Sequence, residues 1–136
     1  MTQEEKDLLL RDLCARSPYG VKFILSGGNI NNIYTMKGVD LIVTDEGIWD
    51  YGVTTKTTEP IEINFIKPYL RSMSSMTEEE KKEFHHLASL QRNYLGDGNF
   101  YTHYQMIDWL DKNMFDYRGL IPMGLALKAK PGMYNN

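Results

Sequence analysis

Apolar residues recur every three to four positions near the start of the chain, the spacing of one face of an α-helix. This set consists of Leu9, Leu10, Leu13 and Cys14. Thr2 is followed three positions later by Glu5, a capping-box pattern in which each side chain accepts a hydrogen bond from the other residue's backbone N–H. The pattern predicts a helix over about residues 3–15, with Cys14 buried as a small core residue.

After this segment the pattern changes to short β-branched and aromatic runs separated by turn-forming residues. The runs predict strands at residues 21–25, 33–36, 41–44, 48–53 and 61–65. Glycines and asparagines between the first two runs indicate a hairpin. In the last run, Ile61, Ile63 and Phe65 alternate with polar residues and are expected to be buried, and Pro68 is expected to end the strand.

Helical spacing returns in the second half of the chain. Thr77 and Glu80 form another capping-box pattern, which predicts a helix from about Glu78 to Tyr94. Its expected inner face contains Phe84, Leu87, Ala88, Gln91 and either Tyr94 or Leu95. Residues 96–99 are expected to form a loop before a third helix that starts near Thr102 and buries Met106, Ile107, Leu110 and Met114. Asp116 is expected to cap a short helical turn, and Pro and Gly residues indicate an irregular C-terminal strap.

These elements predict an α+β fold. The chain has 136 residues, which suffices for one hydrophobic core, and no low-complexity linker divides it. We expect a single domain with an N-terminal helix in residues 1–16, a four- to five-stranded antiparallel meander in 20–66, and a helical part and tail in 77–136. All helices are expected to pack on one face of the sheet.

Charge and cysteine content limit the cellular compartment and the partners that we expect for this chain. The formal net charge is −3, so no global positive field favours binding to nucleic acid or to an anionic membrane. The single cysteine excludes an intrachain disulfide, and the acidic N-terminus is unlike a secretory signal. The apolar runs are too short to span a bilayer. We therefore expect a cytoplasmic protein without a membrane partner.

Residues that could carry catalysis form no recognisable motif. His85 and His86 are adjacent and would point about 100° apart on a helix, so they do not form a ligand pair. Neither a phosphate-binding glycine loop nor a nucleophile elbow occurs in the sequence. We therefore predict no catalytic residue, metal or cofactor. A hydrolase site assembled only in three dimensions, using His103 and Asp108, stays open as an alternative.

The tyrosines and tryptophans are more informative. Nine tyrosines and two tryptophans, many of them in polar company, exceed what a small core requires. Amphipathic rings of this kind either cover a small core or enrich a binding surface. For the second possibility, the predicted sheet offers Tyr34, Trp49 and Tyr51 as an interface with a protein partner or a second copy.

Several stretches also resemble a group of short proteins from gut Bacteroidetes and their phages, for which no activity is established. These stretches are LCARSPYGVK at 13–22, KPYLRSMSSMTEEE at 67–80, and IDWL with FDYRGLI at 107–110 and 115–121. The meander between Lys22 and Ile61 lies outside the resemblance. The resemblance implies a bacterial or phage cytoplasmic setting and supplies no catalytic residue.

The same stretches contain Arg16, Arg71 and Arg118, which could converge on a carboxylate such as Asp108 or Asp116 or on an anionic ligand. A structural salt-bridge cluster and a ligand site are the two interpretations. Taken together, the sequence favours a non-enzymatic binding or adaptor protein of a phage or mobile element that acts through protein–protein contacts. The alternatives are a binder of an anionic metabolite or signalling nucleotide, and the hydrolase.

Overall fold

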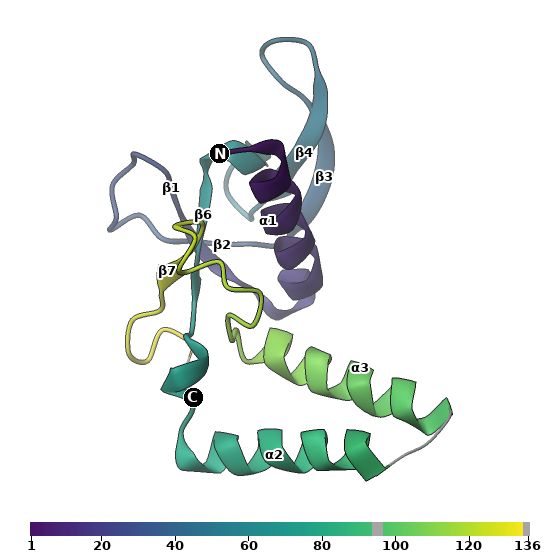
Figure 1. The fold of residues 1–136 in the computed structure, drawn as a ribbon. Helices are drawn as coiled ribbons and strands as arrows, with labels where there is room; N and C mark the ends of the chain where they lie inside the picture. Colours follow the sequence, from purple (N-terminus) through teal and green to yellow (C-terminus); the bar gives the residue numbers. More distant parts are fainter. Residues whose placement is uncertain (94–96, 135–136) are drawn as a thin grey trace.

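A computed structural model of the chain shows, in sequence order, an N-terminal helix, a run of strands, a pair of helices that pack on each other, and a last short strand (Figure 1). It describes residues 1–93 and 97–134, with the main chain alone for 91–93 and 97–102. The helices are α1 (Gln3–Arg16), α2 (Glu78–Asn93) and α3 (Asp97–Lys112), with short 3-10 turns η1 (Ser17–Tyr19), η2 (Ile63–Phe65) and η3 (Met73–Ser75). The strands are β1 (Lys22–Leu25), β2 (Tyr34–Thr35), β3 (Gly38–Val43), β4 (Trp49–Thr54), β5 (Ile61–Glu62), β6 (Ile66–Leu70) and β7 (Leu127–Lys128).

The α+β class and the order of helix, strands and helices are confirmed. The single sheet is wrong: within the described ranges the strands form one sheet of order β2-β1-β6-β7 and another of order β3-β4-β5. The first sheet is antiparallel except for β6 and β7, which run parallel. The predicted hairpin of β1 and β2 is confirmed, with Phe23 opposite Tyr34.

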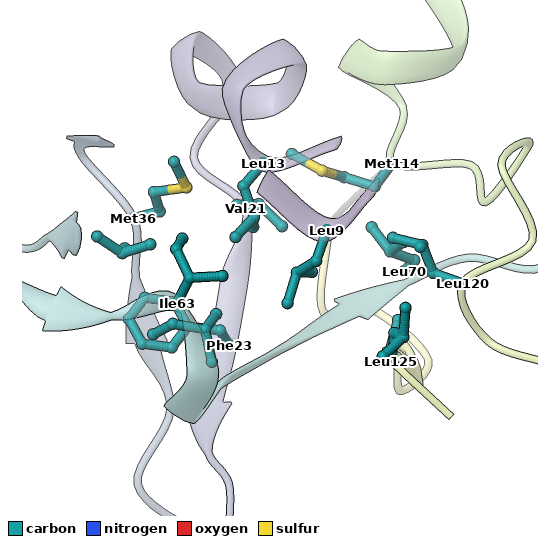
Figure 2. Close-up of a cluster of buried hydrophobic side chains, with 13 residues drawn as sticks. Leu9, Leu13, Val21, Phe23, Met36, Ile63, Leu70, Met114, Leu120 and Leu125 are labelled. Atoms are coloured by element: carbon teal, nitrogen blue, oxygen red, sulfur yellow. The ribbon is translucent and has the colours of Figure 1, made fainter. Parts of the chain in front are cut away.

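The main core lies where α1 meets both sheets (Figure 2). Leu9 and Leu13 of α1 are fully buried there with Val21, Phe23 and Val53. The core also holds Met36, Ile63, Ile66, Leu70, Met114, Leu120, Leu125 and Ala126. Side chains from the N-terminus, both sheets and the C-terminal segment therefore share one apolar volume.

Cys14 is exposed, so its predicted burial is wrong. The buried stripe of α1 runs through Leu9, Asp12, Leu13 and Arg16. Successive helical residues are rotated by about 100°, which places Cys14 off this stripe. The charged Asp12 and Arg16 thus occupy inner positions that the apolar pattern left open.

Two predictions about the last strands are also wrong. Pro68 does not end a strand; it is buried within β6, opposite Phe23. The hydrogen bond from Ser26 N–H to Phe65 O shows which residues of β6 bond to β1, because hydrogen-bonded and non-hydrogen-bonded pairs alternate along an antiparallel ladder. Pro68 lies at a non-hydrogen-bonded position, where β1 requires no N–H donor. β5 ends at Glu62 and η2 follows, so Phe65 is turned outward and is 50% exposed.

The two C-terminal helices pack on each other rather than on a sheet face, contrary to prediction. Phe84 of α2 stacks on Trp109 of α3, and Trp109 stacks on Phe115, with ring centroids 5.9 and 5.6 Å apart. These rings form a second apolar cluster with Met76 and Leu110. An aromatic column therefore joins the helix pair and replaces the expected contact with strands.

The predicted helix boundaries are correct where a cap defines them. Both capping boxes are present, with Glu5 N–H donating to Thr2 Oγ1 at 3.1 Å and Glu80 N–H donating to Thr77 Oγ1 at 3.1 Å. The expected loop at residues 96–99 is wrong for 97–99, because α3 already begins at Asp97. Gly96, Tyr94 and Leu95 lie outside the described residues.

We predict that Gly52→Ala destabilises the protein by about 1–3 kcal/mol, the cost of overpacking. A Cβ at this buried β4 position would meet Ile42 Cδ1 at 3.0 Å and Pro60 Cβ at 3.2 Å. Gly38→Ala is the matched control, because its Cβ would meet Thr54 Oγ1 at an ordinary 3.4 Å. Urea unfolding of both variants checks the difference, and equal stabilities would contradict it.

Candidate interaction surface

The β3–β4 hairpin has one apolar face along its whole length. The register places Val39 opposite Val53, Leu41 opposite Tyr51, and Val43 opposite Trp49. Side chains alternate between the two faces of a strand, so these six share one side. Val53 is fully buried in the main core, and Val39 packs against the same core. The face is thus anchored at its base and extends outward toward the turn (Figure 1).

The outer part of this face is open to solvent. Trp49 is 71% exposed, Leu41 and Val43 are each 54% exposed, and Tyr51 is 43% exposed. We call these four side chains the hairpin face. Single exposed apolar residues are ordinary, but a contiguous group that includes a tryptophan is typical of a contact site.

The half of the hairpin nearer the turn is held to α1 by an ion pair between Lys6 and Asp50, which lies opposite Ile42. Burial acts to raise the pKa of Asp50, but the hydrogen bonds from Lys6 and from the Tyr51 N–H outweigh it and lower the pKa. Asp50 therefore stays ionised, and the pair keeps the hairpin at a fixed angle to the main core. The sequence analysis did not identify this pair, because 44 residues separate its members.

The structure brings together two of the three residues predicted for an interface. Trp49 and Tyr51 lie on the hairpin face, whereas Tyr34 lies on β2 in the other sheet. The Tyr34 ring is half-buried and stacks on Phe23 with centroids 5.5 Å apart. Tyr34 therefore covers the core, as the alternative interpretation of the tyrosines proposed.

The structure also brings together only two of the three arginines predicted to converge. Arg16 and Arg118 converge on Asp12: Arg16 Nε lies 2.9 Å from Asp12 Oδ2, and Arg118 Nη1 lies 2.7 Å from Asp12 Oδ1. Arg71 makes a separate two-pronged pair with Glu80, with Nη1 to Oε2 at 2.8 Å and Nη2 to Oε1 at 2.6 Å. Of the two interpretations left open, this geometry favours the structural salt bridge.

The carboxylates named for this convergence were wrong. Asp116 instead accepts hydrogen bonds from the N–H groups of Leu120 and Ile121 at 2.8 Å each and so closes the turn that follows it, which is not the predicted helical turn. Asp108 is exposed on α3. Asp12 was assigned no role, because a lone carboxylate in an amphipathic helix gives no signal of burial.

Asp12 and Arg16 are both fully buried, and Asp111 lies beside them. Arg118 Nη1 lies 3.6 Å from Asp111 Oδ1, and Tyr117 donates its hydroxyl to the same oxygen at 2.8 Å. Burial raises the pKa of Asp111, and the Tyr117 hydrogen bond and the Arg16 and Arg118 charges offset this only in part. Burial, followed by the bond to Asp111, also raises the pKa of Tyr117.

A hollow of about 630 Å³ opens at the base of the hairpin. We call it the basal hollow, and it is lined by Ser17, Pro18, Gly20, residues 33–37 and residues 55–57. Lys37 and Lys56 are its charged residues, and no carboxylate lines it among the residues that the structure describes. Sequence reasoning missed this hollow because its lining comes from three separate segments.

The histidines considered for catalysis lie on α2 and α3. His85, His86 and His103 are exposed on the helix pair. Within residues 1–93 and 97–134, no group of three His, Cys, Asp or Glu side chains is placed to hold a metal ion. In the same ranges, no helix combines the length and apolar character required to cross a membrane.

Comparisons with protein-family models, curated proteins and solved structures found no match for this chain.

We predict that Asp12→Asn destabilises the protein by about 3–5 kcal/mol, because it leaves the buried Arg16 charge without its carboxylate. Asp7→Asn, on the exposed side of the same helix, should change stability by no more than about 0.5 kcal/mol. Equilibrium urea unfolding measures both. A loss below about 1 kcal/mol at Asp12 would show that the cluster tolerates an unpaired arginine.

A second prediction concerns pH. The Arg71 hydrogen bonds outweigh burial and lower the pKa of Glu80 in the folded state. The stabilisation is therefore present above the unfolded value of about 4.3 and is lost as the pH falls through the lower folded value. Glu80→Gln should then cost most stability near pH 7, and its gap to the wild type should close toward pH 3.

Unfolding curves at several pH values, with Glu79→Gln as the exposed control, test this. Glu79 lies next to Glu80 on the first turn of α2, and its replacement should leave stability within about 0.5 kcal/mol. A gap for Glu80→Gln that stays constant with pH would contradict the ion pair as the source of the effect.

Proposed function

We propose that this chain is a binding or adaptor protein that acts through protein–protein contacts at the hairpin face. The observation that carries the proposal is the exposure of Trp49, 71%, together with three other large apolar side chains on one side of one hairpin. A monomer gains nothing from leaving such rings in water, whereas a partner that covers them gains their burial.

The position of the hairpin face suits this role. Its base is fixed by the buried Val53, and the ion pair of Lys6 with Asp50 holds the part nearer the turn to α1, so the face is presented without further folding. Preorganised side chains lose little conformational entropy on binding. Tryptophan and tyrosine are also the residue types most often found to dominate interface energetics.

The charges around the face indicate the chemistry of what it contacts. The exposed Asp45 and Glu46 lie in the turn next to Val43 and Trp49, and no lysine or arginine occurs between Gly38 and Thr55. A partner surface that is apolar at its centre and basic at its rim complements this arrangement. The resemblance of other stretches to Bacteroidetes and phage proteins is the basis for proposing a phage or mobile element as the setting.

The binder of an anionic metabolite through Arg16, Arg71 or Arg118 receives less support. Each of the three guanidinium groups already has a carboxylate partner. A ligand there would have to displace Asp12 or Glu80, and releasing a buried carboxylate is costly.

The test is a comparative affinity capture from a lysate of gut Bacteroidetes cells, using wild type, the Trp49→Ser/Tyr51→Ser double variant and Tyr104→Ser. Tyr104 is 64% exposed on α3 and serves as the matched aromatic control. We expect a protein that wild type and the control both retain and that the double variant loses. Loss of hot-spot rings costs about 2 kcal/mol or more, which corresponds to roughly thirtyfold in affinity.

The protein captured is then purified and its affinity for each variant is measured by calorimetry. If every protein retained by the wild type is bound equally by the double variant, the hairpin face is not the binding surface. Circular dichroism of the double variant guards against loss of binding through unfolding.

A further inference from the structure

The outer edge of β3 is open. β3 ends the order β3-β4-β5, and no other strand among the described residues pairs with it. The hydrogen bond from Thr44 N–H to Ile48 O identifies the hydrogen-bonded pairs of the β3–β4 ladder, which alternate along the strands. The backbone N–H and C=O groups of Ile42 and Asp40 therefore point toward β4. The N–H and C=O groups of Val39, Leu41 and Val43 therefore point away from β4. In agreement, the Leu41 N–H donates to the Asp40 carboxylate, at 2.9 Å, and not to a strand.

The two ends of the hairpin carry opposite charge. At the turn, Asp45 and Glu46 are both exposed. At the base, Lys37 and Lys56 line the basal hollow together with the hydroxyl-bearing Ser17, Thr35, Thr55 and Thr57. An acidic tip and a basic, hydroxyl-lined hollow thus lie at opposite ends of the same open edge.

We propose that two copies of this chain pair antiparallel along their β3 edges, about a two-fold axis that passes through Leu41. In this register Leu41 lies opposite Leu41 of the second copy, Val39 opposite Val43, and Lys37 opposite Asp45. The acidic tip of each copy then reaches the basal hollow of the other. The Leu41 N–H exchanges its bond with Asp40 for a carbonyl of the neighbouring strand.

The charges along β3 and the alternation of its backbone and side-chain directions favour this register over registers shifted by one or two residues. A shift of two residues in one direction sets Asp40 opposite Asp40, which places like charges directly across the strands. A shift of two in the other direction sets Asp45 opposite Val39 and leaves Lys37 without its partner. A shift of one residue puts the hydrogen-bonding groups out of phase and turns the apolar side chains to the opposite face.

The pairing deepens the proposed function and rests on it. Two β3 strands paired in this way continue one sheet through β5, β4 and β3 of both copies, with both hairpin faces on the same side. The surface offered to a partner is then a composite of Leu41, Val43, Trp49 and Tyr51 from two chains. An isologous contact of this kind closes after two copies and leaves neither β3 edge open.

The register is tested by cysteine cross-linking in a Cys14→Ser background, since Cys14 is an exposed free thiol. Leu41 and Val43 are both 54% exposed, so they form a matched pair. With the axis at Leu41, the two Cα atoms of Leu41→Cys lie about 5.5 Å apart, within disulfide range. Those of Val43→Cys lie roughly 13 Å apart, since the two positions are offset by four residues.

We expect Leu41→Cys to form a covalent dimer under mild oxidation at least tenfold faster than Val43→Cys. Non-reducing electrophoresis reports the product. Absence of cross-linking at Leu41, or equal rates at both positions, overturns the proposed register.

Charge exchange tests the contact between tip and hollow, and sedimentation velocity reads the oligomeric state. The wild type is expected to be dimeric, and Lys37→Glu/Lys56→Glu and Asp45→Lys/Glu46→Lys are each expected to be monomeric. An equimolar mixture of the two variants restores opposite charges at both contacts and should form a heterodimer. This recovery also shows that both variants are folded.

A monomeric wild type, dimeric variants, or a mixture that stays monomeric each overturns the proposal. The proposed function can fail or hold separately, because Trp49 and Tyr51 lie on β4, away from the paired edge. A monomer that still captures its partner through Trp49 refutes only the pairing. A dimer whose double variant retains every partner refutes only the hairpin face as a docking site.

Discussion

The fold depends on a buried guanidinium group. Arg16 is fully buried, and a charge removed from water is tolerated only when it is paired and hydrogen-bonded. Asp12 accepts two of its hydrogen bonds, and the Phe115 carbonyl accepts a third at 2.6 Å. These partners come from α1 and from the segment after α3, 99 residues away. The bonds of this one side chain therefore join α1 to the segment after α3.

A second arginine extends this connection to the helix pair. The guanidinium of Arg71 lies over the Phe115 ring, 4.2 Å from its centroid, and pairs with Glu80 at the start of α2. Its backbone also accepts from the Asp116 N–H and donates to the Met114 carbonyl. The end of β6 is thus joined to both C-terminal helices by backbone, ring and charge at one point.

Met114 shows how tightly this junction is determined. It lies two residues beyond the end of α3 in the left-handed region, with φ of 62°, where glycine is usual. The Phe115 N–H reaches back to Leu110 and the Met114 N–H to Asp111, which forms a Schellman motif. The methionine side chain is buried in the main core. Its packing there offsets a backbone conformation that a side chain ordinarily disfavours.

Elements defined by local chemistry could be predicted from the sequence. Both capping boxes and the first hairpin depend on residues a few positions apart, and the sequence shows them directly. The position of Cys14 could not be predicted, because the inner stripe of α1 contains the charged Asp12 and Arg16, whose partners lie far along the chain. Likewise, Pro68 is tolerated within β6 because of the hydrogen-bonding phase of its neighbour β1, which the sequence does not show.

The candidate site could likewise be predicted only in part. Trp49 and Tyr51 are two residues apart on one strand, so the sequence pattern predicts that they share a face. The position of Tyr34 depends on the order of the strands in the sheets, which the sequence does not show. The basal hollow and the opposite charges at the two ends of the hairpin depend on three segments that only the tertiary structure brings together.

An exposed apolar edge strand is ordinarily an aggregation hazard. In this hairpin, acidic residues are spread along both strands and the turn, and the lysines occur only at the base. Copies that meet tip to tip, or in a register that opposes Asp40 to itself, repel each other. Only the antiparallel alignment brings each acidic tip to a basic hollow. In the proposed dimer, the charges that keep misaligned copies apart are therefore the same charges that favour the aligned pair.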